Sequence, residues 1–263
     1  MTPVPEAKSE ATKRVKADRP VALVTGGARG MGFSCASALA PDCAGVAIID
    51  IDADAIDRAS SKLRRFATPH AGFTADVTDA DQVNKTVEEV TRSLGSPTIL
   101  INAAGILRPT RFLDIDESEW DAVVNVSLKG SFLCSKACLP GMIDRGWGRI
   151  INFSSTAGKN VSTLGGAHYT AAKAGLLGLT RALATEVAAF GVCVNAVCPG
   201  LIDTEMSWAY CSPERLKEFV EATPIGRLGE PEEVADLVTF LCSERSSYIT
   251  GAALDINGGQ LMV

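Results

Sequence analysis

Apolar runs alternate with helix-length amphipathic stretches along most of the chain. Runs bounded by turn residues predict buried strands: VALVT (21–25), VAIID (46–50), TILIN (98–102), RIINFSS (149–155), VCVNAV (192–197) and AALDI (252–256). AGFTADV (71–77) is a weaker strand candidate. Helices are predicted between them, at 30–40, 79–94, 117–140, 168–190 and 231–243. Because strand and helix alternate throughout, the pattern predicts an α/β fold, a doubly wound parallel β-sheet of about seven strands flanked by helices on both faces.

The alternation continues without a change in composition, which predicts one domain over residues 20–263. Residues 1–19 are polar and of mixed charge, without the apolar stretch of a signal peptide, and predict a disordered N-terminal leader. The least regular segment is 201–229, around a helical piece at 213–222. Ligands bind at the carboxyl ends of the strands in such sheets. This segment is therefore a candidate substrate lid, and a plain surface loop is the alternative.

Charge and cysteine content argue against several classes of function. The chain has 25 Lys and Arg against 31 Asp and Glu, and its net charge of −6 argues against a nucleic-acid or anionic-membrane partner. No window contains the roughly 18 uncharged apolar residues that a membrane span requires. The eight cysteines form no CxxC pair and the two histidines form no ligand cluster, so we expect no metal site. Without a secretion signal, we expect reduced thiols and a cytoplasmic protein.

The segment between the first strand and the first helix has the composition of a phosphate-binding loop. It reads TGGARGMG, with Gly26, Gly30 and Gly32 in GxxxGxG spacing rather than the commoner GxGxxG. Glycines permit a tight turn and close backbone approach, and the helix N-terminus offers N–H groups to a pyrophosphate. The position of this loop predicts a dinucleotide site and gives the predicted sheet a Rossmann-type character.

The second strand ends at Asp50, 24 residues after Gly26. A carboxylate there can accept both hydroxyls of the adenosine ribose and repels a 2′-phosphate, which predicts NAD rather than NADP. Arg29 favours NADP, because a basic group beside the loop could meet a phosphate. We give Asp50 the larger weight, since its repulsion acts at the 2′ position itself. A carboxylate that only caps the end of a strand is the alternative.

The segment HYTAAK begins a predicted helix and contains a candidate catalytic pair. Tyr169 and Lys173 are separated by one helical turn, so both side chains lie on one face. A free tyrosine ionises near pH 10, which is too high for an efficient base at neutral pH. A nearby ammonium and a positive nicotinamide ring would both favour the phenolate. His168 points elsewhere on the helix, and we expect a surface or loop-packing histidine there.

These segments follow the order typical of the classical short-chain dehydrogenase/reductase family, which the chain resembles from about residue 20 to its C-terminus. The shared motifs are TGGxxGMG, Asp50, the pair Asp76-Val77, NAAG (102–105), the serines before YxxxK, and PGLIDT (199–204). The resemblance implies a metal-independent, NAD-dependent oxidoreductase acting on CH–OH groups. It would transfer a hydride between the cofactor and a secondary alcohol or ketone, with Tyr169 as the general acid/base.

The resemblance also implies roles for individual residues. Ser155 would hydrogen-bond the substrate oxygen, Tyr169 would exchange a proton with it, and Lys173 would bind the nicotinamide ribose and lower the pKa of the tyrosine. Several segments would contact the cofactor, through Gly26, Arg29, Gly30, Met31, Gly32, Asp50, Ile51, Asp76, Val77, Asn102, Ala103, Gly105, Tyr169, Lys173, Pro199, Gly200, Ile202 and Thr204.

The chain departs from the family pattern at three places. The usual NNAG reads NAAG, with Ala103 in place of the second asparagine. Ser155 stands fourteen residues before Tyr169, whereas the family spacing is about thirteen, so Ser154 is the alternative catalytic serine. The asparagine of the family's catalytic tetrad falls on Ser127. A serine hydroxyl could bind the water that the asparagine supports in the family.

Two other functions are weighed against this one. An NADPH-dependent 3-oxoacyl-carrier-protein reductase is the first alternative, and Asp50 argues against it. A non-catalytic dinucleotide-binding redox sensor is the second, and the presence of Tyr169 and Lys173 argues against that.

The substrate and the assembly are predicted only in outline. Four side chains of the least regular segments favour an apolar small-molecule alcohol or carbonyl substrate: Leu164, Met206, Trp208 and Tyr210. The family resemblance implies a homotetramer, in which the catalytic helix and the helix over 117–140 form a subunit interface.

Overall fold

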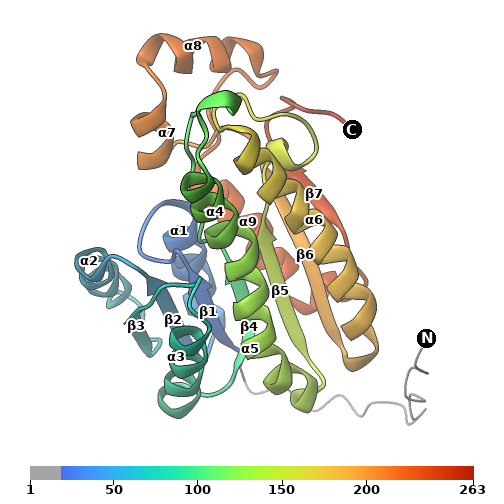
Figure 1. Ribbon diagram of the computed structural model, residues 1–263. Coiled ribbons are helices and arrows are strands. Elements are labelled where there is room, and N and C mark those ends of the chain that lie inside the picture. The colour runs from blue at the N-terminus through green and yellow to red at the C-terminus, as the bar shows by residue number, and fades with distance from the viewer. Residues whose placement is uncertain (1–18) are drawn as a thin grey trace.

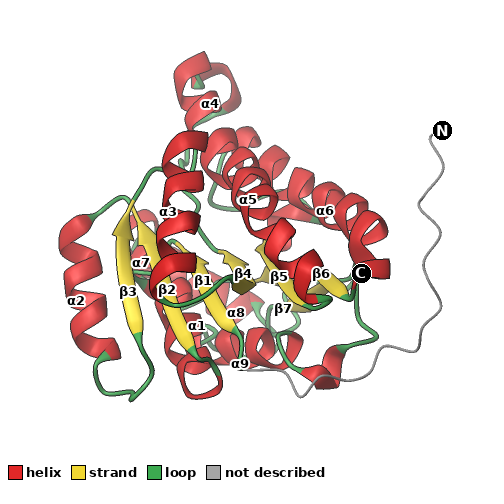
Figure 2. Ribbon diagram, turned by 90° about the horizontal axis from the view of Figure 1, so that it is seen from below, coloured by secondary structure: helices red, strands yellow, loops and turns green. Residues whose placement is uncertain are grey.

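The sheet is entirely parallel and has seven strands in the order β3-β2-β1-β4-β5-β6-β7 in this computed structural model (Figure 1). The structure describes residues 19–263. The leader predicted over 1–19 lies outside this range except for its last residue, and it stays a prediction. The predicted fold class is confirmed, since the strands form one doubly wound sheet with helices on both faces (Figure 2).

Each predicted strand is present within a few residues of its expected limits. The strands are β1 (Val21–Thr25), β2 (Gly45–Asp50), β3 (His70–Thr74), β4 (Pro97–Asn102), β5 (Gly148–Phe153), β6 (Val192–Pro199) and β7 (Ala253–Ile256). The central strands β1, β4, β5 and β6 are buried along their whole length, which explains their uninterrupted apolar runs. The weaker strand candidate at 71–77 corresponds to β3, an edge strand whose residues are partly buried or exposed.

The long helices pack as two layers, one on each face of the sheet (Figure 2). One layer contains α1 (Gly30–Leu39), α2 (Ala53–Leu63) and α9 (Pro231–Leu241), and the other contains α3 (Ala80–Ser93), α5 (Gly130–Arg145) and α6 (Ala167–Val187). Helix α2 was not among the predicted ranges. Short 3₁₀ turns complete the connections, at Ala40–Asp42, Phe112–Asp114, Thr156–Gly158, Ala188–Phe190 and Glu244–Ser246.

The helix predicted over 117–140 is interrupted. It consists of α4 (Glu117–Val124), a π-helical turn (Asn125–Lys129) and α5, which continues to Arg145 and ends at the left-handed Gly146. Turns of this kind are rare and occur frequently at functional sites. The turn contains Ser127, which the sequence placed on a regular helix.

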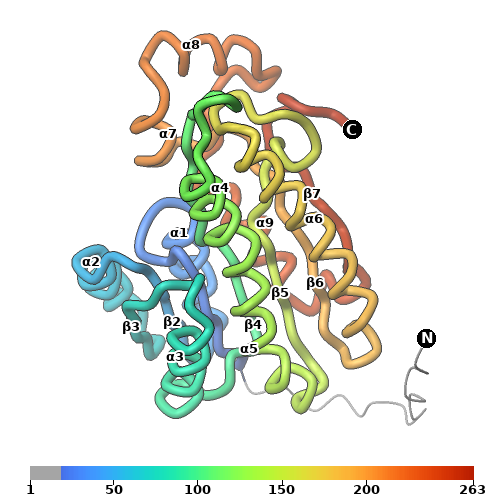
Figure 3. Tube along the Cα trace, viewed as in Figure 1, coloured from blue at the N-terminus to red at the C-terminus, as the bar shows by residue number. Residues whose placement is uncertain are grey.

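The chain crosses between the two halves of the sheet beside β1, whose neighbours are β2 and β4. Sheets of this type bind ligands at such a switch point, outside the carboxyl ends of the strands. Helices α7 (Glu205–Tyr210) and α8 (Pro213–Ala222) project from this end of the molecule, beside the loop that follows β4 (Figure 3). The switch point and the two projecting helices therefore enclose the region where the predicted site residues meet.

Candidate active site

The turn between β1 and α1 has the geometry of a cradle for a phosphate. Gly26 and Gly30 have positive φ angles of 60° and 51°, which favour glycine. A Cβ on Gly26 would lie 2.9 Å from the backbone of Ala104, and one on Gly32 would overlap the Gly26 carbonyl oxygen. The Arg29 side chain does not cap α1, so the first amide groups of the helix stay available to an anion. These residues fit the pyrophosphate of a dinucleotide.

Asp50 lies beside this loop, at the carboxyl end of β2. Its Oδ2 accepts a hydrogen bond from the Ala28 amide (3.3 Å), and its Oδ1 accepts one from the Asp52 amide (3.2 Å). Arg29, the residue that favoured NADP in the sequence, forms an ion pair with Asp52 at 3.0 Å. The carboxyl of Asp52 has a lowered pKa, because it accepts the Ala55 amide and lies near Arg29. The basic group of Arg29 is therefore paired with an acidic one.

Of the remaining residues predicted to contact the cofactor, Met31, Gly200, Ile202 and Thr204 line one cavity with Ser155 and Tyr169, whereas one other is turned into the sheet. Asp76 accepts hydrogen bonds from Thr78, which shapes the turn after β3, and Ile51 is exposed beside the loop. The residue turned into the sheet is Asn102, whose buried amide donates to Asn152 (2.9 Å), so its side chain joins β4 to β5. Thr204 lies close enough to Gly30 that a Cβ there would contact it at 3.6 Å.

Ser155, Tyr169 and Lys173 meet at the carboxyl ends of β5 and β6. The Lys173 Nζ donates to the Phe153 carbonyl oxygen (2.6 Å) and lies 5.5 Å from the centroid of the Tyr169 ring. Burial lowers the pKa of Lys173 to about 8. Burial raises the pKa of Tyr169, and a hydrogen bond with the Ser155 side chain opposes that shift. The structure thus brings the three predicted catalytic side chains together.

The two serines after β5 have different surroundings. The hydroxyl of Ser154 is buried and donates to the Lys173 carbonyl oxygen (2.8 Å), so it faces the backbone of α6. The hydroxyl of Ser155 accepts the Ala157 amide (3.1 Å) and interacts with Tyr169. Ser155 also lines the cavity at this end of the sheet, whereas Ser154 does not. The geometry therefore favours Ser155 as the serine that faces a substrate.

Ser127 is completely buried in the π-helical turn, and its hydroxyl has no hydrogen-bond partner. Its Oγ and the Lys173 Nζ face the same space beside Gly105: a Cβ on this glycine would lie 3.4 Å from each of the two atoms. An unpaired buried hydroxyl is costly unless a water or ligand satisfies it. The arrangement fits a small hydrogen-bonding species, such as a water molecule, between the serine and the lysine.

A cavity opens above Ser155 and Tyr169 and extends under the lid segment. Apolar side chains line it, including Leu107, Leu164, Met206 and Phe219, together with the hydroxyl and amide side chains of Ser162, Thr163, Thr204, Ser207 and Gln260. Tyr210 also lines it, and its hydroxyl accepts a hydrogen bond from the Arg108 guanidinium (2.7 Å), which ties α7 to the loop after β4. Trp208 is half exposed and donates to Asp203 (2.6 Å), so it does not line this cavity.

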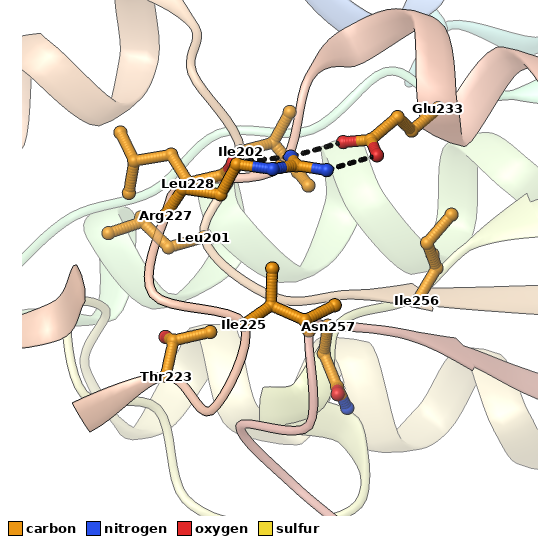
Figure 4. A pocket seen from close by; sticks show the side chains of 11 residues that line it. Leu201, Ile202, Thr223, Ile225, Arg227, Leu228, Glu233, Ile256 and Asn257 are labelled. Carbon is orange, nitrogen blue, oxygen red and sulfur yellow. Dashed lines mark hydrogen bonds and ion pairs between the residues drawn. The ribbon is translucent and has the colours of Figure 1, made fainter. Parts of the chain in front are cut away.

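A second cavity lies on the other side of Leu201 and Ile202, at the base of the lid segment (Figure 4). Arg227 donates two hydrogen bonds of 2.7 Å to Glu233 at its rim and lowers the pKa of that carboxyl to about 2. Backbone hydrogen bonds link Gly229 with Leu201 and Asp203 nearby. The two ends of the lid segment are therefore fastened to each other.

The sequence missed one buried side chain beside the catalytic pair. His168 is fully buried and lies 2.9 Å from Glu119, so the expectation of a surface or loop-packing histidine was wrong. Its burial depends on α4, which is distant in sequence, and a pattern confined to the catalytic helix does not contain that information.

All eight cysteines are free and buried. Between residues 19 and 263, no group of three or more His, Cys, Asp or Glu side chains is arranged to hold a metal ion. Over the same range, no helix combines the length and the apolar character needed to cross a membrane.

Comparison with known proteins gives a consistent result. A family model described as enoyl-(acyl carrier protein) reductase matches residues 26–260. The 3-oxoacyl-[acyl-carrier-protein] reductase FabG of Pseudomonas aeruginosa is 41% identical over 243 residues, covering 92% of this chain and 97% of that protein. The (3R)-3-hydroxyacyl-CoA dehydrogenase of Mus musculus is 39% identical over 255 residues, covering 92% and 96%. A crystal structure of a 3-oxoacyl-[acyl-carrier protein] reductase from Brucella melitensis with bound NAD has a TM-score of 0.86 at 33% identity, covering 94% and 92%.

The fold, the glycine turn and these similarities define an enzyme of the nicotinamide-dependent oxidoreductase class. The chain belongs to the short-chain dehydrogenase/reductase family. It is an oxidoreductase that acts on CH–OH groups and the corresponding ketones.

Proposed function

We propose that the protein transfers a hydride between NAD(H) and a secondary alcohol or ketone, with Tyr169 as the general acid/base. The observation that carries this proposal is the meeting of Ser155, Tyr169 and Lys173 at one end of a cavity beside the glycine turn. Bound NAD(H) supplies or accepts the hydride at this end of the sheet. The residues of the chain then have to orient the substrate oxygen and move one proton.

In the direction of reduction, Ser155 donates a hydrogen bond to the carbonyl oxygen of the substrate and Tyr169 donates the proton that completes the alcohol. Burial raises the pKa of the Tyr169 phenol, so the tyrosine carries at neutral pH the proton that it donates. The ammonium of Lys173 favours the phenolate that forms after transfer, since an opposite charge lowers the pKa of a nearby acid. The serine, the tyrosine and the lysine thus have separate tasks.

Ser127 takes the place of the asparagine that the family resemblance led us to expect. Its buried, unpaired hydroxyl and the Lys173 Nζ both lie 3.4 Å from the position that a Cβ on Gly105 would take. A water held there would give a proton to Lys173 as the lysine passes its own proton to the Tyr169 phenolate, which restores the phenol after each turnover. This role needs only one hydroxyl, so the replacement by serine is compatible with activity.

Two acidic residues support NAD as the cofactor rather than NADP. Asp50 lies at the carboxyl end of β2, beside the loop, where a 2′-phosphate would meet its charge. Asp52 forms an ion pair with Arg29, so this cation beside the loop is already paired with an acidic group. The relative with bound NAD supports the same choice.

For the substrate, we propose a molecule with an apolar part next to the reacting carbon. The apolar walls contributed by Leu107, Leu164, Met206 and Phe219 support this. A 3-oxoacyl thioester is the second candidate, since relatives named for such substrates cover almost the whole chain. The segment 201–229 would act as a lid, because its ends are fastened together and its helices α7 and α8 border the cavity.

The protein would act as a cytoplasmic homotetramer. Trp120 and Phe132 are substantially exposed on α4 and α5, and Gly178 on α6 has no atom within 4 Å of a Cβ built there. A small-residue surface beside exposed aromatic side chains suits the close approach of a second subunit.

The test is an absorbance assay of nicotinamide oxidation and reduction with NADH and NADPH in parallel. The substrates are apolar ketones, their secondary alcohols and an acetoacetyl thioester. Turnover with NADH at least about tenfold more efficient than with NADPH supports the proposal, since tenfold corresponds to about 1.4 kcal/mol of discrimination. A preference for NADPH together with exclusive use of the thioester would replace it with the 3-oxoacyl reductase.

A further inference from the structure

His168 occupies a closed site between α4 and the first turn of α6, with none of its surface exposed. The Trp120 ring lies on one side, with its centroid 6.4 Å from that of the imidazole. Gly166 approaches from another side so closely that a Cβ there would lie 2.8 Å from the imidazole Cε1. A ring enclosed in this way has a fixed orientation, and each of its nitrogen atoms faces a defined partner.

The two partners of the ring select one protonation state. The backbone N–H of Tyr169 donates to Nδ1 (2.8 Å), and Nε2 lies 2.9 Å from the Oε1 of Glu119. A backbone N–H can only donate and a carboxylate can only accept. The neutral ring with its hydrogen on Nε2 is therefore the form that satisfies both contacts.

Glu119 is itself held in place, in the first turn of α4. Its amide donates to the Asp116 carboxylate (2.8 Å), which caps that helix. The pKa of Glu119 is lowered, first by a hydrogen bond from the Thr110 side chain and then by His168. Thr110 and Trp120 are uncharged, so this carboxylate is the only charged group among the described contacts of the imidazole.

The position of Nδ1 has a consequence for the catalytic tyrosine. Helix α6 begins after Gly166, a residue without a side chain to cap the helix. The Tyr169 amide is one of the N-terminal amides that lack a regular helical partner, and it donates both to the Gly166 carbonyl oxygen (3.1 Å) and to Nδ1 of His168. The imidazole thus provides the acceptor that a capping side chain provides in other helices.

We infer that Glu119 and His168 form a positioning pair that fixes the backbone of Tyr169 and so holds its hydroxyl beside Ser155. Neither residue touches the cavity, so both act through the tyrosine and are not catalytic residues. The pair links α4 to the proton-transfer group, since α4 and α6 pack against each other. The inference extends the proposed function, because it assumes Tyr169 as the general acid/base.

The first arm of the test is independent of turnover. The chain has two histidines, His70 and His168, so ¹⁵N-histidine labelling gives two imidazole spin systems, and His168→Asn assigns them. We expect His168 at neutral pH to show a proton on Nε2 and none on Nδ1. A proton on Nδ1, or protons on both nitrogens, would overturn the positioning pair even if the proposed reaction is correct.

The second arm compares two substitutions at the same position. In His168→Asn, the Oδ1 replaces Nδ1 as acceptor for the Tyr169 amide, although contact with Glu119 is lost. In His168→Gln, the side chain reaches towards Glu119 and leaves the amide without its acceptor. We expect kcat to fall about tenfold or more in His168→Gln and less than about threefold in His168→Asn, because small displacements of a reacting group cost large factors in rate. NADH affinity should change by less than about twofold in both.

Glu119 supplies the matched control. Glu119→Ala should lower kcat in the native background, whereas in the His168→Asn background it should have no further effect on kcat. Glu119→Gln keeps an acceptor for Nε2 and should restore most of the activity. Equal kcat values in His168→Asn and His168→Gln, or losses confined to NADH affinity and thermal stability, would show an ordinary structural role and overturn the inference.

Discussion

The two sides of the active site are built in different ways. On the cofactor side, backbone atoms form the site: positive φ angles at Gly26 and Gly30 and the N-terminus of α1 create the turn. On the substrate side, side chains from distant segments form it, as where Arg108 meets Tyr210 across the cavity. A backbone site needs particular residues at fixed spacing, whereas a cavity of side chains tolerates many combinations. The first kind is therefore visible in a sequence, and the second is not.

The largest effect is expected where the two sides meet. Tyr169→Phe removes the hydroxyl that contacts Ser155 and keeps the ring, so kcat should fall by about 10²–10⁴, the usual contribution of general acid–base catalysis. NADH affinity, measured by fluorescence titration, should remain within about threefold, because the change affects proton transfer and not the backbone turn. If NADH affinity fell by the same factor as kcat, Tyr169 would contribute to cofactor binding as well as to proton transfer, which would contradict the division into two sides.

The cofactor side should be sensitive to a single methyl group. Gly32→Ala places a Cβ against the Gly26 carbonyl oxygen, and we expect the Kd for NADH to rise by about 100-fold or more, about 2.8 kcal/mol. Glu88→Ala, at an exposed position on α3, is the control and should leave the Kd unchanged. Equal affinities in the two variants would contradict the steric account of the turn.

Cofactor choice should depend on both acidic residues. Asp50→Ala removes the repulsion of a 2′-phosphate, and Asp52→Ala releases Arg29 from its ion pair. We expect each change to raise the ratio of kcat/KM for NADPH over NADH by about tenfold and the double variant by about 100-fold, or about 1.4 kcal/mol per step. When Arg29→Ala is added to the double variant, the increase in this ratio that Asp52→Ala causes should be lost. An unchanged ratio in the double variant would place cofactor discrimination elsewhere.

A change on the substrate side should have a smaller effect, and it should alter the KM for the substrate rather than the Kd for NADH. Tyr210→Phe removes the hydroxyl that accepts from Arg108 and keeps the ring in the cavity wall. One partly exposed hydrogen bond is worth about 1 kcal/mol, so KM for the substrate should rise about fivefold while the Kd for NADH is unchanged. Trp208→Phe, at a side chain outside this cavity, is the control. A larger effect on NADH than on substrate would mean that α7 belongs to the cofactor side.

A last effect concerns stability and pH rather than turnover. Burial lowers the pKa of Lys173 from 10.5 to about 8. Between these values the unfolded chain keeps the lysine proton that the folded protein has lost, so Lys173 makes the free energy of unfolding rise with pH in this window. Below about pH 8, both states bind the proton and this dependence ends. Lys173→Met should remove the rise, measured as the difference between the urea unfolding curves of the two proteins from about pH 7 to pH 10. Parallel pH profiles would contradict the lowered pKa.

The sequence predicted most of the fold and the position of the glycine turn between β1 and α1. The central strands were predicted because a buried parallel strand is apolar along its whole length, as β4 and β6 are. Helix α2 was missed although its apolar face, with Ile56 and Leu63, is well defined. The π-helical turn around Ser127 has no local signature, since the preceding and following helices share one continuous pattern.

The substrate side was predicted only as a list of candidate residues. The spacing left Ser154 and Ser155 as alternatives, and only the fold shows that one faces the backbone of α6 and the other faces Tyr169. The burial of His168 depends on a contact with Glu119, 49 residues away in the sequence. Contacts of this kind arise from packing between helices, and no spacing within one segment reveals them.

The most direct test of the central claim follows the hydride itself. NADH deuterated at the transferable position of the nicotinamide is incubated with the enzyme and a ketone substrate, and the alcohol is analysed by mass spectrometry. We predict that the native enzyme forms an alcohol with deuterium at its carbinol carbon. The Tyr169→Phe variant should form this alcohol at least about 100-fold more slowly. Oxidation of NADH without deuterium in the alcohol, or equal rates in the two proteins, would contradict direct transfer at a site served by Tyr169.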